Sequence, residues 1–181
     1  MSQLRLQMEQ AAVQSYRAYY DVEEYRDAGP LKALCAYHSR AAQYVLVKKA
    51  ELWSAETNEY VYLWSLPRLD EEALEMIFQK TLEDGVPRIH PHKDHMSTFL
   101  TAVVLCSEAG PQALARLKTL KQRKNFRLSL HGWMEFRIAA AVLDCGVFAA
   151  NRPGRETAQF LEQLAQSVSQ KSIKRGEEKL T

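Results

Sequence analysis

The run EYVYLWSL, residues 59–66, constrains the fold of this chain more than any other stretch. Successive side chains of a β-strand point to opposite faces, so this run places Tyr60, Tyr62 and Trp64 on one face. Aromatic and β-branched residues favour strands, and aromatic side chains stabilise neighbouring strands by packing across them. The chain is therefore expected to build a β-sheet with an aromatic face.

A second apolar run begins at Tyr44 and continues to Trp53. The segment between the two runs, SAETN at residues 54–58, is rich in turn-forming residues, which predicts a β-hairpin with its turn there. Pro67 has no backbone N–H and is expected to end the second strand. The preceding stretch, residues 31–42, fits an edge strand or a short helix equally well.

Several segments show the apolar spacing that is typical of amphipathic helices. The first carries a tyrosine-rich stripe that is expected to pack into the core. The second is capped by Asp70, and Gly85 is expected to end it in a left-handed conformation. The predicted helices cover residues 2–26, residues 70–84, a segment that begins at Gly110-Pro111, and residues 155–169.

Further strands are predicted in the second half of the chain. Residues 97–106, STFLTAVVLC, are apolar and β-branched and are expected to form a central strand. A period-two alternation returns at Phe126–Leu130 and again at Met134–Val142. Pro153-Gly154 has the residue order of a type II turn.

These elements predict a single α+β domain over residues 1–170. It consists of a mostly antiparallel sheet of about five to six strands, packed with about four α-helices. Hairpins bring neighbouring strands together antiparallel, and helices interrupt them without strict alternation. The last segment, residues 171–181, is polar and is expected to form a disordered tail.

Charge and cysteine content restrict the class of protein. Positive and negative side chains nearly balance at a net charge of +2, so nucleic acid is not the expected partner. The chain contains no run of about 18 apolar residues, so no membrane partner is expected. Cys35, Cys106 and Cys145 are separated in the sequence, an arrangement that is typical of reduced thiols in a cytoplasmic protein.

Three of the five histidines fall within HPHKDH, residues 90–95. Alternation puts His90 and His92 on one side of an extended segment, and His95 can return to that side if the chain turns. Imidazole and carboxylate groups are zinc ligands. The candidate metal ligands are therefore His90, His92, Asp94 and His95. The alternative is a polar loop ahead of a strand.

The same four residues resemble the H-x-H-x-D-H motif of the metallo-β-lactamase-like hydrolases. The resemblance implies one or two bound zinc ions that activate a water molecule by lowering its pKa. The family also requires a histidine ligand well beyond the motif. His131 is the only later histidine in this chain, and it lies inside an expected strand.

A basic segment lies around the end of the third predicted helix and is a candidate phosphate-binding surface. Its cationic residues are Arg116, Lys118, Lys121, Arg123, Lys124 and Arg127. Cations are also favoured near a helix C-terminus by the backbone dipole, so part of this segment has a structural explanation. No RNA- or DNA-binding motif accompanies it in the sequence.

Trp133, Glu135 and Arg137 share one face of a predicted strand, opposite its apolar side chains. If no helix covers this face, it is a candidate surface for a ligand or a partner. The alternative is a cross-strand ion pair. Gly132 lies next to this set and is expected to mark a bulge or a bend.

The leading interpretation is a cytoplasmic binding domain for an unidentified protein partner or a small molecule, with a homodimer as one candidate assembly. No complete catalytic set is visible, so we lean against an enzyme and predict no cofactor. Two alternatives stay open. One is a metal-dependent hydrolase with zinc or another divalent metal at the histidine loop, and the other is phosphate or nucleic-acid binding through the basic segment.

Overall fold

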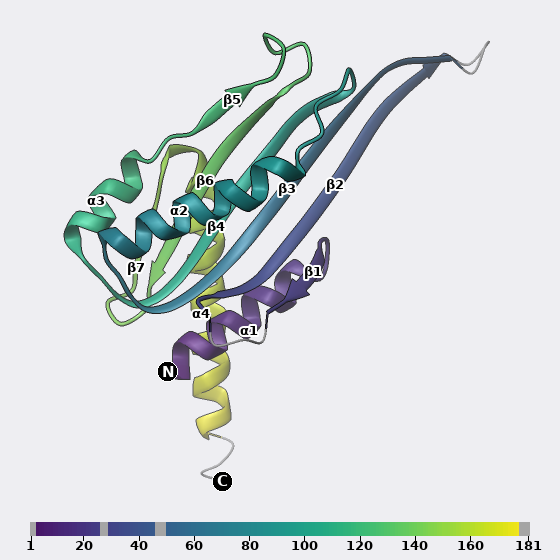
Figure 1. Cartoon of the computed structure of the whole chain (residues 1–181). Helices are drawn as coiled ribbons and strands as arrows, with labels where there is room; N and C mark the ends of the chain where they lie inside the picture. The colour runs from purple at the N-terminus through teal and green to yellow at the C-terminus, as the bar shows by residue number, and fades with distance from the viewer. Residues whose placement is uncertain (1–2, 26–28, 46–49, 178–181) are drawn as a thin grey trace.

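The domain is built on one open β-sheet, and its helices pack on that sheet (Figure 1). The computed structural model describes the backbone of residues 3–25, 29–45 and 50–177, and the side chains of these residues except 41–54 and 172–177. The strands are β1 (Asp21–Glu24), β2 (Leu31–Val45), β3 (Ala50–Leu69), β4 (His95–Ala109), β5 (Arg123–Asn125), β6 (Trp133–Val142) and β7 (Val147–Ala150). The helices are α1 (Gln3–Tyr16), α2 (Glu71–Gly85), α3 (Pro111–Thr119) and α4 (Arg155–Glu177), with 3-10 turns η1 (Val86–Arg88) and η2 (Arg152–Gly154).

The α+β class and the four helices agree with the prediction, but the sheet is mixed rather than mostly antiparallel. Within the described residues it has seven strands, in the order β1-β2-β3-β4-β6-β5, with β7 beside β6. The central strands β3, β4 and β6 run parallel, and the outer pairs run antiparallel. The reason is that a helix connects each central strand to the next, which lets the chain return to the same end of the sheet.

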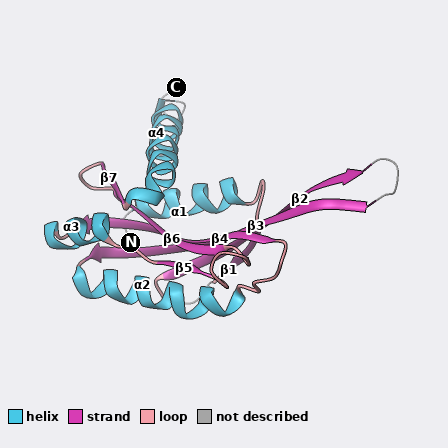
Figure 2. Cartoon of the chain, turned by 90° about the horizontal axis from the view of Figure 1, so that it is seen from above, coloured by secondary structure: helices cyan, strands magenta, loops and turns pink. Residues whose placement is uncertain are grey.

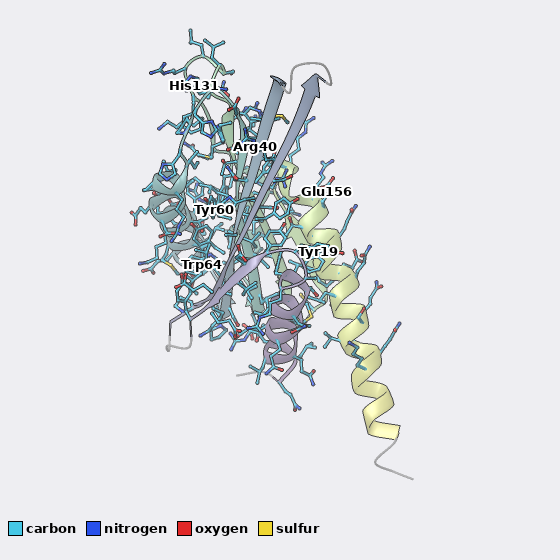
Figure 3. All side chains as sticks on the ribbon, turned by 90° about the vertical axis from the view of Figure 1, so that its right-hand side faces the viewer. Tyr19, Arg40, Tyr60, Trp64, His131 and Glu156 are labelled. Carbon is cyan, nitrogen blue, oxygen red and sulfur yellow. The ribbon has the colours of Figure 1, made fainter. Side chains whose placement is uncertain are left out.

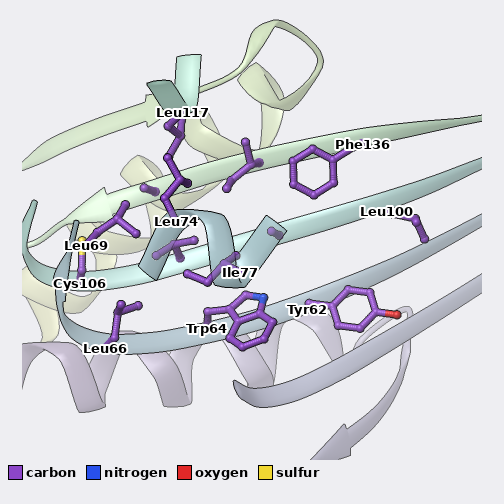
Figure 4. Packing of buried hydrophobic residues seen from close by; sticks show 14 of the residues in the cluster. Tyr62, Trp64, Leu66, Leu69, Leu74, Ile77, Leu100, Cys106, Leu117 and Phe136 are labelled. Carbon is purple, nitrogen blue, oxygen red and sulfur yellow. The ribbon is translucent and has the colours of Figure 1, made fainter. Parts of the chain in front are cut away.

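The helices cover the sheet in two layers, and each layer has its own apolar core (Figure 2). Helices α2 and α3 pack on one face, and α1 and α4 pack on the other. Strand alternation divides β3 between the two cores: Tyr62 and Trp64 face α2, and Val61 and Leu63 face α1 and α4. Figure 4 shows the aromatic side chains of β3 lying beneath α2, as the period-two pattern predicts.

The first half of the chain contains more strand than its sequence indicated. The first helix ends at Tyr16, and β1 lies within residues 2–26, which were predicted to be one helix. The ambiguous residues 31–42 belong to strand β2. The segment 54–58, expected to turn, lies inside β3 and pairs with β2, while residues 46–49 between the two strands lie outside the described residues. Pro67 does not end β3, which continues to Leu69.

The second half differs from the prediction mainly around β5. Residues 126–130 form no strand, and Leu128 and Leu130 are 95% and 76% exposed. Three consecutive residues, Arg127, Leu128 and Ser129, have positive φ, a conformation that breaks the alternating strand geometry. Pro153-Gly154 lies in the 3-10 turn η2 rather than in a type II turn. Helix α4 extends to Glu177, and residues 178–181 of the expected tail lie outside the described part of the chain.

Several local predictions are confirmed. Asp70 caps α2 by accepting a hydrogen bond from the backbone N–H of Ala73. Gly132 has a φ of +75°, and a Cβ there would lie 2.5 Å from the carbonyl oxygen of His95. The bend at Gly132 is therefore required both by the backbone conformation and by the close approach of β4. Gly85, in contrast, has a φ of −75° and is not a left-handed stop.

Candidate functional site

The histidine loop does not bring its side chains together around one point. His90 is exposed, and His92 Nε2 lies 2.9 Å from a carboxylate oxygen of Glu56 on β3. His95 is buried, with Nδ1 at 2.7 Å from the carbonyl oxygen of His131 and Nε2 at 2.8 Å from Oγ1 of Thr98. The rings of His92 and His95 lie 6.3 Å apart between centroids, but they bond to different partners.

The hydrogen bonds of His95 leave it poorly placed as a metal ligand. A carbonyl oxygen only accepts, so Nδ1 must carry the proton and donate to His131. In the neutral ring, the Nε2 lone pair then accepts the hydroxyl proton of Thr98. Across the described residues, no three His, Cys, Asp or Glu side chains are grouped so that they could hold a metal ion. The metal hypothesis stays a prediction, and the geometry gives His95 a role in fastening β4 to the loop before β6.

Trp133, Glu135 and Arg137 lie on the sheet face that carries α1 and α4. Arg123 of β5 lies over the Trp133 ring, with its Cζ 4.3 Å from the ring centroid. Trp133 meets Phe99 of β4 edge to face at 5.3 Å, and the Cζ of Arg137 lies 3.4 Å from the Phe99 centroid. Two guanidinium groups therefore flank a pair of aromatic rings across three strands, and each guanidinium makes a favourable cation–π contact. We call Arg123, Trp133, Phe99 and Arg137 the stacked row.

Glu59 of β3 anchors one end of the stacked row. Its carboxylate accepts hydrogen bonds from the hydroxyls of Tyr20 at 2.8 Å and Thr101 at 2.6 Å, and lies 3.7 Å from Arg137. Burial, and then the charge of Glu59, raise the pKa of Tyr20, so its hydroxyl remains a donor. The Nε of Arg137 is buried and has no hydrogen-bond partner in the described residues. At the other end, Glu135 pairs with Arg123 at 3.6 Å.

A depression of about 930 Å³ lies at the edge of the sheet, beside the end of α3. Its cationic side chains come from separate parts of the chain: Lys118 from α3, Lys121 and Arg123 from the segment that enters β5, and Arg152 from η2. The remaining lining includes Gln122, Glu135 and Phe136. Four cationic side chains and one carboxylate give this basic depression a net charge of +3.

The Asn151 side chain forms hydrogen bonds to backbone groups of the segments that line the basic depression. Its side chain is fully buried and uses both ends of the amide. Nδ2 donates to the carbonyl oxygens of Leu120 at 3.1 Å and Phe136 at 3.2 Å. Oδ1 accepts from the backbone N–H groups of Ile138 at 3.1 Å and Gly154 at 3.0 Å. The amide therefore fixes η2, β6 and the end of α3 relative to one another.

The structure divides the basic segment into two groups. Lys118, Lys121 and Arg123 line the basic depression. Arg116 instead points to α2, where it pairs with Glu75 at 2.6 Å. The others lie further along the chain: Lys124 covers the ring of Phe126 at 5.7 Å, and Arg127 is in the loop with positive φ. Of the cations in the depression, Lys118, Lys121 and Arg152 form no ion pair with any described residue.

Comparison with known families gives a match over most of the domain. Residues 7–163 match the model of a family described as "Domain of unknown function (DUF8052)". The chain belongs to this family. Comparison with the curated proteins and with the solved structures found no match. The part matched by the DUF8052 model runs from α1 into α4 and includes every residue of the basic depression.

Two residues that shape the basic depression were missed from the sequence. Arg152 lies well outside the basic segment, and its neighbours Asn151 and Pro153 suggested only a turn. Asn151 itself indicated no buried role, because asparagine is common in turns. The description of the DUF8052 family leaves its function open, so the geometry of the site has to indicate what the domain does.

None of the described helices is long and apolar enough to cross a membrane.

Proposed function

We propose that this domain binds a small phosphate-bearing anion in the basic depression. The observation that carries the proposal is the convergence of Arg152 with Lys118, Lys121 and Arg123 around one cavity. A volume of about 930 Å³ lies within the range of small-molecule sites, which is about 300–1,000 Å³. Cations that lack a protein partner at such a cavity favour an anion as the ligand.

The proposed ligand must overcome the backbone dipole of α3, since the C-terminal end of a helix carries partial negative charge. Local hydrogen bonds reduce this disadvantage. The carbonyl of Arg116 accepts the hydroxyl of Thr119 at 2.8 Å, and Asn151 donates to the carbonyl of Leu120. The dipole term at an exposed helix end is about 0.3–1 kcal/mol, so a site with a net charge of +3 still favours an anion.

The shape of the site supports a compact ligand rather than a nucleic acid. The cations line one depression, and Glu135 adds one negative charge to the lining. Arg116 pairs with Glu75 and Lys124 covers the ring of Phe126. Neither these two nor Arg127 lines the depression, so the cations do not form a basic strip. Arginine binds phosphate oxygens through two parallel N–H groups, and lysine acts as a point charge. The lining contains two residues of each kind, so it offers a phosphate group both types of contact.

Inorganic pyrophosphate is a direct probe of this proposal. We expect isothermal titration calorimetry to show one binding site, with an affinity that falls as the salt concentration rises. Removing one charged hydrogen-bond donor should lower the affinity about tenfold or more in each of the variants R152Q and K121Q.

The matched control is R127Q, which removes the same charge from the basic segment but outside the basic depression. It should keep the affinity of the unaltered protein within about twofold. The proposal is wrong if pyrophosphate does not bind, or if R127Q weakens binding as much as R152Q does. Displacement of pyrophosphate by a short single-stranded RNA at much lower concentration would instead favour nucleic acid as the ligand.

A further inference from the structure

A separate cavity, of about 450 Å³, lies between α1, α4 and the sheet. Its lining comes from the end of α1 and the turn after it, from the first turns of α4, and from one residue each of β3 and β6. Figure 3 shows Tyr19 and Glu156, two of the lining residues, on the same side of the molecule. The cavity shares no lining residue with the basic depression, so a ligand binds here whether or not the proposed anion site exists. We call it the tyrosine cavity.

Four aromatic side chains line the tyrosine cavity: Tyr16, Tyr19, Tyr20 and Phe160. Tyr19 is 80% exposed and the other three are half-buried, so all four retain surface that a ligand can touch. Tyr16 meets Tyr20 edge to face at 5.1 Å between ring centroids, and it meets Phe160 at 5.5 Å. Within the described residues Tyr19 contacts no other ring and Phe160 contacts only Tyr16, so both keep a ring face that no other ring covers. The face of an aromatic ring is electronegative and attracts cations.

The charged residues of the lining are Glu59, Arg137 and Glu156, which give the tyrosine cavity a net charge of −1. Arg137 is already engaged, because its Cζ lies 3.4 Å from the centroid of the Phe99 ring and its Nη1 lies 3.7 Å from Glu59. Glu156 is exposed and forms no ion pair with any residue that the structure describes. The N-terminus of α4 carries about half a positive charge, which the full charge of Glu156 outweighs. A cation in this cavity therefore has an unpaired carboxylate available to it.

We propose that the tyrosine cavity binds a small organic cation whose nitrogen carries alkyl groups, such as a quaternary ammonium. The alkyl groups pack on the aromatic side chains, and the positive charge is attracted both by the ring faces and by Glu156. The two features together define the ligand class. Aromatic walls alone favour any apolar molecule, and a lone carboxylate favours any cation, whereas this lining combines them in one cavity of ligand size.

Proton nuclear magnetic resonance on the full chain tests the inference, with choline as the probe. The matched control is 3,3-dimethylbutan-1-ol, which has the same shape as choline but no charge. At constant ionic strength, we expect choline to fill one saturable site and its methyl signal to shift upfield, because the methyl groups lie over ring faces. The neutral control should bind at least about tenfold more weakly. Sodium acetate should not displace choline, since the net charge of the cavity repels an anion.

Variants separate the rings from the charge. Y19L removes an exposed ring and E156Q removes the unpaired charge, so each should weaken choline binding about threefold, and the double variant about tenfold. Both side chains are exposed, so these substitutions leave the fold intact. The controls Y25L and E162Q remove the same groups outside the cavity and should bind choline unchanged. The inference is overturned if choline gives no saturable shift, if the neutral control binds as tightly, if acetate displaces choline, or if the two control variants weaken binding as much as Y19L and E156Q.

Discussion

At the scale of single residues, the buried asparagine Asn151 determines the local geometry of the basic depression. It makes four hydrogen bonds to backbone groups that belong to three segments of the chain. The hydrogen bonds to Phe136, Ile138 and Gly154 are buried, so loss of the amide leaves these backbone groups without a partner. Asn151 is thus a positioning residue, and it acts on a ligand only through Arg152 and the end of α3.

We expect N151A to lower the free energy of unfolding by about 3 kcal/mol or more, because it leaves several buried donors and acceptors unpaired. Urea denaturation measures this change. The control N125A removes an exposed asparagine and should change the free energy of unfolding by less than about 0.5 kcal/mol. Equal effects of the two substitutions would show that the hydrogen bonds of Asn151 contribute little.

At the scale of elements, two residues determine how the end of α2 packs on the sheet: the carboxylate of Asp84 and the glycine Gly85. Asp84 accepts hydrogen bonds from Tyr62 of β3 and from Arg88 just beyond the helix. Gly85 lets the helix approach closely, since a Cβ there would lie 2.7 Å from a methyl carbon of Leu100. Close packing, rather than a left-handed conformation, therefore explains this glycine.

The pKa of Asp84 predicts how this helix end responds to pH. The bonds from Arg88 lower the pKa of Asp84 in the folded protein below its value in the unfolded chain, which is about 3.9. The resulting stabilisation is complete above the unfolded pKa and is lost as the pH falls through the folded pKa. The difference in unfolding free energy between the unaltered protein and D84N should therefore be constant near neutral pH and shrink below about pH 4.

Urea denaturation across this pH range measures the effect. E83Q is the control for the same helix turn, because Glu83 is exposed and should change the unfolding free energy at neutral pH by less than about 0.5 kcal/mol. A difference for D84N that grows as the pH falls would contradict the assigned ion pair.

At the scale of the whole molecule, the helices leave part of one sheet face open around the stacked row. Phe99, Trp133, Glu135 and Arg137 are only partly buried there. Figure 3 shows Tyr19 and Glu156 on the side where α1 and α4 pack, and His131 at the distant end of the molecule beyond them. The open face carries positive and negative side chains, which form two ion pairs: Glu59 with Arg137, and Glu135 with Arg123.

A two-fold interface requires a surface that is complementary to itself, and the open face carries side chains of both charges. We therefore expect this face to mediate a homodimer. Light scattering after size-exclusion chromatography should give twice the monomer mass. W133E should give the monomer mass, since it places a charge in the centre of the aromatic contact. L128E adds the same charge to the exposed loop and should remain dimeric. A monomer mass for the unaltered protein at high concentration would contradict the expected dimer.

The amino-acid sequence by itself determined the local elements with the strongest periodicity. The alternation of β3, the apolar length of β4 and the residues 134–142 of β6 each identified a strand and its buried face. Asp70 and Pro111 marked helix starts, and Gly132 marked the bend. These features depend on neighbours within a few residues, which is the range over which side-chain pattern and backbone conformation are coupled.

The tertiary structure alone decided which elements meet. Parallel pairing of β3, β4 and β6, the strand at residues 31–42, and the approach of Arg152 to Lys118 join parts of the chain that are far apart in sequence. Such contacts reflect the burial of whole faces against one another, so no short pattern contains them. The histidine cluster shows the converse: His92 and His95 are close in sequence, but tertiary contacts give each its own hydrogen-bond partners.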